Sequence, residues 1–194
     1  MSLKLTSKGL RQLKHDRRSM LAATALTFLA LLLGAALKSS VENRSQSIER
    51  KNITASVPEG WVVEFGAGDL IFTSWDPFNP DIRYSVFLSS NQSNGILTEA
   101  ASNRIIVLSK GLEGFKLLEE TPIIRRAREG YKVTYAFIDT NQPGMPLVLR
   151  GVDYYFPAEG RTMIISLQAH EREYEEALLH FELFLDSVSY ISGE

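Results

Sequence analysis

Residues 131–137 read YKVTYAF, and this alternation of apolar and polar side chains decides the fold class. Tyr131, Val133, Tyr135 and Phe137 fall on one face of an extended chain, as in a half-buried β-strand. Residues 162–167, TMIISL, alternate in the same way. Residues 147–156, LVLRGVDYYF, are apolar on both faces, which predicts a central strand. Weaker patterns predict further strands at 53–57, 61–65, 70–75, 82–88 and 115–124.

Turn and helix patterns complete the expected domain. Residues 139–146 and 158–160 offer turn chemistry between neighbouring strands, so we expect a mainly antiparallel sheet. Thr98 is a candidate N-cap for a helix that ends at Gly111, and an apolar stripe predicts a second helix from Glu171 to about Ser187. The order strands, helix, strands, helix predicts an α+β domain whose sheet is covered by two helices.

The amino-terminal part predicts a single transmembrane helix at residues 20–37. This stretch, MLAATALTFLALLLGAAL, carries no charge, and as a helix it is about 27 Å long, close to the hydrocarbon thickness of a bilayer. Small residues at its end, Gly34, Ala35 and Ala36, would permit close packing against other membrane helices. A cleaved signal peptide is the alternative, although its apolar region is usually only about 7–15 residues long.

The flanking charges predict the orientation of that helix. Before it, the topology-setting cations Lys14, Arg17 and Arg18 belong to a group of six with a single opposing Asp16. The positive-inside rule then places the amino terminus in the cytoplasm. We therefore expect a protein of the cell membrane with four parts: a basic cytoplasmic segment 1–19, the membrane helix 20–37, a polar linker 38–52 and an extracytoplasmic α+β domain 53–194.

Charge and composition exclude several classes of protein. The net charge of −2 divides into eight Lys and Arg against three Asp and Glu in residues 1–49, and thirteen against twenty in residues 50–194. An acidic domain disfavours nucleic acid as a partner. The absence of cysteine excludes disulfides, thiolate metal sites and a lipid-modified cysteine. We expect the partners to be the lipid bilayer and other subunits of a membrane complex.

Catalytic and metal-binding motifs are missing from the sequence. It contains three histidines and no phosphate-binding loop, nucleophile elbow or zinc-protease motif. His170 stands beside Glu171, Glu173, Glu175 and Glu176, but carboxylates that begin a helix are better explained by its dipole than by a metal. We therefore expect no enzyme activity, no cofactor and no metal.

Two groups of residues are candidates for partner docking. Arg125, Arg126 and Arg128 form a basic cluster that could receive a carboxylate, a phosphate or an acidic partner, or could be a solvated turn. Trp75 and Phe78 lie beside Pro77 and Pro80, where they form either an exposed docking loop or part of the core.

Several of these segments together resemble the PsbP, Mog1 and DcrB group of α/β/α sandwich domains. The resemblance rests on 57–61 (VPEGW), the aromatic segment 72–77 (FTSWDP), a middle helix, long antiparallel strands and a closing helix that ends at 184–188 (FLDSV). It implies a PsbP-like, non-catalytic accessory subunit or assembly factor of a membrane complex, such as a respiratory or photosynthetic one. The alternative hypothesis is a membrane-tethered binding module for a small ligand or envelope component, with a pocket lined by Tyr131, Tyr154 or Arg150.

Overall fold

The computed structural model describes residues 20, 24, 26–34, 44–89, 96–140 and 146–191. The chain divides into two compact units, Met1–Arg44 and Ser45–Glu194, and the second holds the whole α+β domain. Each unit is described by itself.

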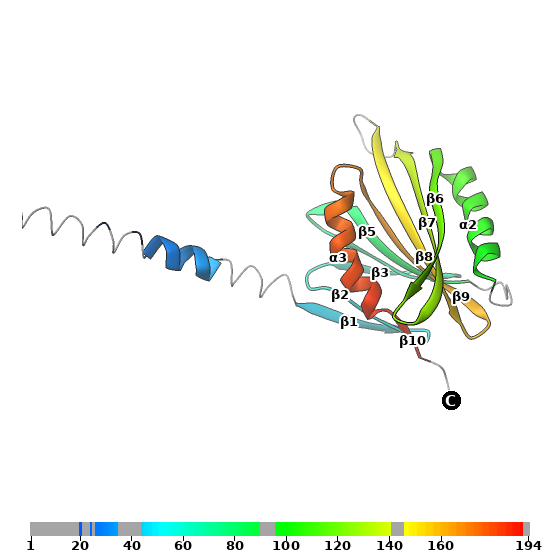
Figure 1. The fold of residues 1–194 in the computed structure, drawn as a ribbon, viewed down its shortest axis with the longest axis horizontal. Helices are drawn as coiled ribbons and strands as arrows, with labels where there is room; N and C mark the ends of the chain where they lie inside the picture. The colour runs from blue at the N-terminus through cyan, green and yellow to red at the C-terminus, as the bar shows by residue number, and fades with distance from the viewer. Residues whose placement is uncertain are drawn as a thin grey trace, which may run out of the picture. The chain divides into compact units, whose positions relative to one another are not determined.

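The domain is built around a seven-stranded sheet in the order β3-β4-β5-β9-β8-β7-β6 (Figure 1). All neighbouring strands in it are antiparallel, as the turn chemistry predicted. The strands are β3 (Val62–Phe65), β4 (Leu70–Asp76), β5 (Asn79–Leu88), β6 (Glu113–Arg125), β7 (Arg128–Asp139), β8 (Leu147–Ala158) and β9 (Arg161–His170).

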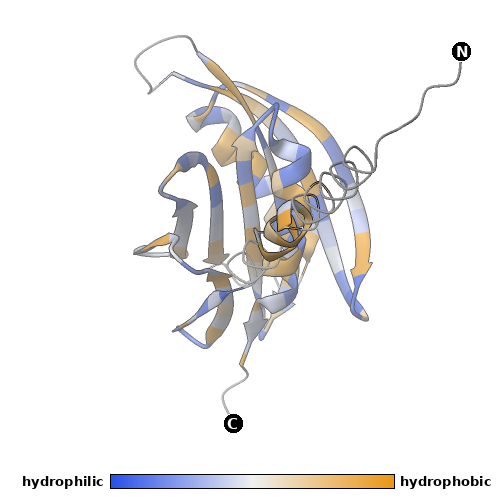
Figure 2. Ribbon diagram, turned by 90° about the vertical axis from the view of Figure 1, so that its left-hand side faces the viewer, coloured by the Kyte–Doolittle hydropathy of each residue, from blue (hydrophilic) through white to orange (hydrophobic). Residues whose placement is uncertain are grey.

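The middle of the sheet is the part that the sequence predicted best. β8 and β9 lie inside the sheet, and apolar residues are buried on both faces of each strand. The central strand expected at 147–156 is confirmed. In β5, buried residues alternate with more exposed ones from Arg83 to Leu88, and Figure 2 shows hydrophobic and hydrophilic colours alternating along several strands.

Two helices cover opposite faces of this sheet, and Figure 1 shows the sheet between them. Helix α2 (Leu97–Gly111) packs Ala100 and Ala101 onto a cluster that includes Tyr135 and Tyr155. Helix α3 (Tyr174–Ser187) packs Phe181 and Phe184 onto the other face. The expected α+β class and α/β/α sandwich are confirmed.

The helix boundaries differ slightly from the expected ones. Ile96, and not Thr98, occupies the N-cap position of α2, and no side chain caps that end. Residues 171–173 form a turn before α3 begins at Tyr174. In both cases the apolar stripe correctly predicted that a helix is present, but the polar residues near its start did not predict its first residue.

A second, three-stranded sheet corrects the expected linker 38–52. Its order is β1-β2-β10, with β1 at Ser45–Arg50, β2 at Ile53–Pro58 and β10 at Ser189–Tyr190. β1 pairs with β2 over its whole length through a tight turn at Lys51 and Asn52, where φ is 48° and 64°. Ile48, only 7% exposed, packs into the same core as α3. The linker prediction was wrong for residues 45–52, because backbone pairing and one buried side chain hold a polar strand in place.

The sheet ends at two edges of unequal length. β3 has four residues, and Gln46 and Arg50 of β1 donate hydrogen bonds to the carbonyl oxygens of Trp61 and Gly66 at its two ends. β6 has thirteen residues, and its register with β7 shifts at Glu113/Lys116 and at Leu117/Glu119. Both shifts are β-bulges or local irregularities, which bend and twist a strand.

The amino-terminal unit is described only in part. Met20, Thr24 and residues 26–34 are helical and exposed. Within the described residues no helix has the length and apolar character needed to cross a bilayer. The remaining residues of the expected membrane helix, and the segments 1–19 and 38–43, lie outside the described part, so the anchor stays a prediction.

Candidate functional site

The three arginines of the predicted docking cluster lie at the β6–β7 turn. Arg125 pairs with Arg128 across the hairpin, and the two turn residues Arg126 and Ala127 have φ of 48° and 60°. A positive φ at both central residues matches the right-handed twist of the two strands. The tight turn therefore brings all three cations to one hairpin tip.

Two of these arginines are bound to the end of α3. Arg125 donates from Nε to Asp186 Oδ1 at 2.7 Å and from Nη1 to Glu182 Oε2 at 2.5 Å. Arg126 donates from Nη2 to Asp186 Oδ2 at 2.8 Å and from Nη1 to the Asp186 carbonyl oxygen at 3.0 Å. Burial acts to lower the pKa of the Arg125 guanidinium, but the hydrogen bonds to Asp186 and Glu182 outweigh it and raise the pKa. These contacts attach the hairpin to the helix.

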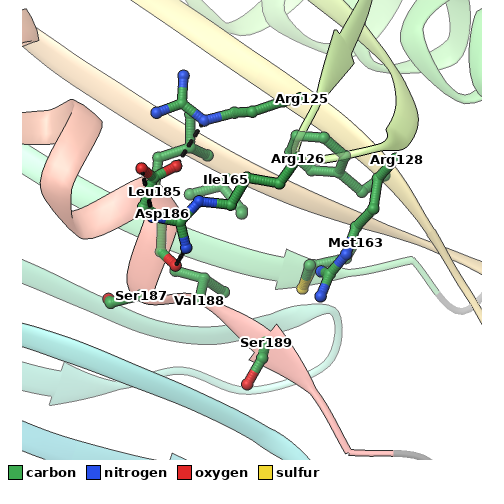
Figure 3. A pocket seen from close by; sticks show the side chains of 11 residues that line it. Arg125, Arg126, Arg128, Met163, Ile165, Leu185, Asp186, Ser187, Val188 and Ser189 are labelled. Carbon is green, nitrogen blue, oxygen red and sulfur yellow. Dashed lines mark hydrogen bonds and ion pairs between the residues drawn. The ribbon is translucent and has the colours of Figure 1, made fainter.

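A cavity of about 280 Å³ opens beside this ion-pair network. Its apolar wall comes from the sheet and from the end of α3, and its polar side comes from the three arginines, Asp186 and two serines. Figure 3 shows Arg125 and Arg126 turned to Asp186, whereas the Arg128 side chain reaches toward Met163. The lining residues are Arg125, Arg126, Arg128, Phe156, Met163, Ile165, Leu185, Asp186, Ser187, Val188 and Ser189.

The second predicted docking group occupies the β4–β5 turn. Phe78 is 96% exposed, whereas Trp75 is half-buried. The Phe78 amide donates to Asp76 Oδ1 at 2.8 Å, and Asn79 Nδ2 donates to Glu173 Oε2 at 2.6 Å. The turn is thus fixed by its own hydrogen bond and by a contact to the residue before α3, and it presents one aromatic ring to solvent.

The other predicted site residues fall in the amino-terminal unit. Gly34 is helical, and no atom within the described residues lies within 4 Å of the space where its Cβ would be. Lys14, Arg17, Arg18, Ala35 and Ala36 lie outside the described residues.

Sequence reasoning missed a buried ion pair on the α2 side of the sheet. Asp153 on β8 is fully buried, and Arg104 of α2 donates from Nε to Asp153 Oδ2 at 2.6 Å. The hydroxyls of Tyr135 and Tyr155 donate to the same carboxylate at 3.4 and 3.3 Å. Burial raises the pKa of both tyrosines, and the Asp153 charge adds to that shift. A carboxylate inside a strand that is apolar on both faces was the available signal, because such a group needs a partner.

A glycine gives Tyr135 the room to reach Asp153. Gly151 stands opposite Tyr135 in the β7–β8 register, and a Cβ at this position would overlap the tyrosine ring. Beside this network lies a second cavity of about 210 Å³. Its lining includes Arg104, whose guanidinium is stacked on the Phe87 ring at 4.1 Å and is already paired with Asp153.

The pocket expected at Tyr131, Tyr154 or Arg150 is not formed by either of these two cavities. Arg150 is stacked on the Tyr174 ring at 4.1 Å and lies 3.2 Å from Glu175. Across residues 44–89, 96–140 and 146–191 no three metal-ligating side chains gather.

The described domain has the fold of a PsbP-like α/β/α sandwich. Its described part shares this fold with cyanobacterial PsbP from Synechocystis, at a TM-score of 0.59 and 15% identity over 75% of this chain and 92% of that one. The Ran-binding protein Mog1p of Saccharomyces cerevisiae is also similar, at a TM-score of 0.55 and 11% identity over 77% of this chain and 96% of that one. No family model and no curated protein matches the sequence. The resemblance to the PsbP and Mog1 group is thus confirmed for the fold.

Proposed function

We propose that this protein is a non-catalytic accessory subunit or assembly factor of a membrane protein complex, anchored by one helix at residues 20–37. In this proposal the amino terminus is cytoplasmic, the PsbP-like domain is extracytoplasmic, and the domain binds another subunit. The charge asymmetry of the chain supports the orientation. Among the proteins of similar fold, Mog1p is described as Ran-binding, so at least one such domain binds a protein.

The observation that carries the proposal is the exposed Phe78 on a fixed turn. Aromatic anchors dominate the energetics of protein interfaces, and the Phe78 ring is free to serve as one because it is almost fully exposed. The Asp76 and Asn79 hydrogen bonds hold the turn in one conformation. A partner that covers Phe78 therefore loses little affinity to the ordering of this loop.

Partner binding is tested with tagged full-length protein purified in mild detergent at native expression level. Phe78→Ala should reduce the co-purifying subunits about tenfold, the effect of a modest hot spot, and leave the unfolding midpoint unchanged. Leu179→Ala removes another large exposed apolar side chain, 71% exposed and located on α3, and is the matched control. Equal recovery of partners with Phe78→Ala and the wild type, or a wild-type protein recovered only as a monomer, contradicts the proposal.

The membrane topology is tested by a separate experiment. Because the chain contains no cysteine, a single cysteine can be introduced at a chosen position and labelled there. A single cysteine at Glu64, exposed on β3, should react with an impermeant maleimide on intact cells. A cysteine at Lys8 should react only after the membrane is opened. The reverse pattern would reject the proposed orientation.

A further inference from the structure

The cavity beside the β6–β7 turn contains one cation without a partner among the residues that the structure describes. Arg125 and Arg126 direct their hydrogen bonds to Glu182 and Asp186. Arg128 has no hydrogen bond or ion pair to any described residue, although it lines the cavity together with Asp186. Among the described residues of this ion-pair network, three guanidinium groups face the two carboxylates of Glu182 and Asp186, so one positive charge is in excess. The domain as a whole is acidic.

The other polar side chains of the lining already have partners. Ser187 Oγ donates to the Phe184 carbonyl oxygen at 2.7 Å and accepts from the Ser56 amide at 2.9 Å. Ser189 Oγ and Thr54 Oγ1 share a hydrogen bond of 2.6 Å. Within the described part of the chain, Arg128 is therefore the lining side chain left to pair with an incoming charge.

The rest of the cavity is an apolar surface. Phe156, Met163, Ile165, Leu185 and Val188 contribute to it, and each belongs to the core on the α3 side. A volume of about 280 Å³ is near the lower limit for small-molecule sites. At roughly 30 Å³ per non-hydrogen atom, estimated from the volume of a water molecule, about nine atoms fit.

Charge and shape together select a ligand with a single negative charge and a short apolar body. A guanidinium pairs a carboxylate through two parallel hydrogen bonds. A phosphate dianion fits less well, because only one positive charge is uncompensated and the Asp186 carboxylate is part of the same lining. We propose that this cavity binds a small aliphatic carboxylic acid, whose carboxylate pairs with Arg128 and whose chain lies against Met163, Ile165 and Phe156.

This site lies away from the surface used in the proposed function. The Phe78 turn is linked to the residue before α3, whereas the cavity is formed at the end of that helix. A helix of fourteen residues is about 20 Å long. Binding of the acid is measured on the free protein, so its outcome does not depend on whether Phe78 docks a partner.

Met163 provides a clean probe, because the sequence contains four methionines and, among those that the structure describes, only this one lines the cavity. Full-length protein with ¹³C-methyl methionine is titrated in detergent with hexanoate, and Met163→Leu assigns the signal. We expect the Met163 methyl to shift with a dissociation constant of about 1 mM. Hexanol, which has the chain without the charge, and acetate, which has the charge without the chain, should bind about tenfold more weakly.

Arg128→Gln should weaken hexanoate binding about tenfold, since it removes one exposed charge-assisted contact. Because Arg128 is exposed, this variant should remain folded. Arg172→Gln removes an exposed arginine near the start of α3 and is the matched control, with binding unchanged. The proposal is overturned if hexanoate leaves Met163 unshifted at 20 mM, if hexanol or inorganic phosphate binds as well as hexanoate, or if Arg128→Gln binds like the wild type.

Discussion

Replacing Arg104 with methionine should lower the free energy of unfolding by about 3 to 5 kcal/mol at neutral pH. The change removes the 2.6 Å charge-assisted hydrogen bond to Asp153, and it leaves a carboxylate that is fully buried. The remaining partners of that carboxylate are two tyrosine hydroxyls at 3.3 and 3.4 Å, which are long hydrogen bonds and compensate only part of the charge. Solvent screens the pair little, because the Arg104 side chain is only 17% exposed.

A double-mutant cycle separates the ion pair from simple loss of packing. Asp153→Asn alone should cost about 2 to 3 kcal/mol, because it strands a mostly buried guanidinium. Arg104→Met with Asp153→Asn removes both charges and should lie within about 2 kcal/mol of the wild type. Methionine keeps much of the length of the arginine stem, so cavity formation contributes little.

Urea unfolding of the full-length chain, followed by the fluorescence of Trp61 and Trp75, measures all four proteins. Arg172→Met is the control for removing an arginine from the surface and should change the free energy of unfolding by less than about 0.5 kcal/mol. A loss below about 1 kcal/mol for Arg104→Met would refute the reasoning. Strictly additive effects in the double variant would refute it as well.

Two further predictions concern the small sheet and alkaline pH. Ile48→Ala should lower the free energy of unfolding by about 2 to 4 kcal/mol, because Ile48 is the buried side chain that joins β1 to the core. Gln46→Ala on the same strand is the control, and urea unfolding measures both variants. If both lose the same small amount of unfolding free energy, β1 is dispensable. Burial is the largest cause of a raised pKa in five tyrosines, and it raises that of Tyr154 to about 12. The others are Tyr84, Tyr135, Tyr155 and Tyr174. Above the usual tyrosine pKa of about 10 the unfolded chain loses these protons while the folded domain keeps them, so stability should fall as pH rises, by up to about 1.4 kcal/mol per pH unit for each tyrosine. Urea midpoints at pH 9, 10 and 11 check this, and Tyr154→Phe should reduce the slope; a flat or rising profile contradicts it.

The sequence predicted the parts of the fold whose side chains repeat with a clear period. β8 was recognisable as an inner strand because 147–156 is apolar on both faces, and α3 because its apolar stripe repeats with the helical period. β1 was missed because five of its six residues are polar and only Ile48 is buried. It is held by backbone pairing with β2 and by that single side chain, and composition reveals neither.

The sequence predicted which residues belong to the candidate site, but it did not predict how they are arranged. Arg125, Arg126 and Arg128 are adjacent in sequence, so their clustering was expected. The sequence did not indicate that Arg125 and Arg126 form ion pairs whereas Arg128 forms none with any described residue. This difference depends on carboxylates in α3, some sixty positions away in the sequence. Arg104 and Asp153 likewise belong to elements forty-nine positions apart, and only the sheet topology brings them together.

The irregular edge strand β6 limits how this domain can associate with other chains. An open edge can accept an added β-strand, and charged side chains, proline and bulges oppose this. β6 carries Glu119, Glu120 and Pro122 in addition to its two register shifts, and the opposite edge strand β3 has only four residues. Strand addition to the large sheet is thereby disfavoured at both ends. Concentrated preparations should resist sheet-to-sheet aggregation, and binding partners should contact side chains on turns and helices rather than extend the sheet.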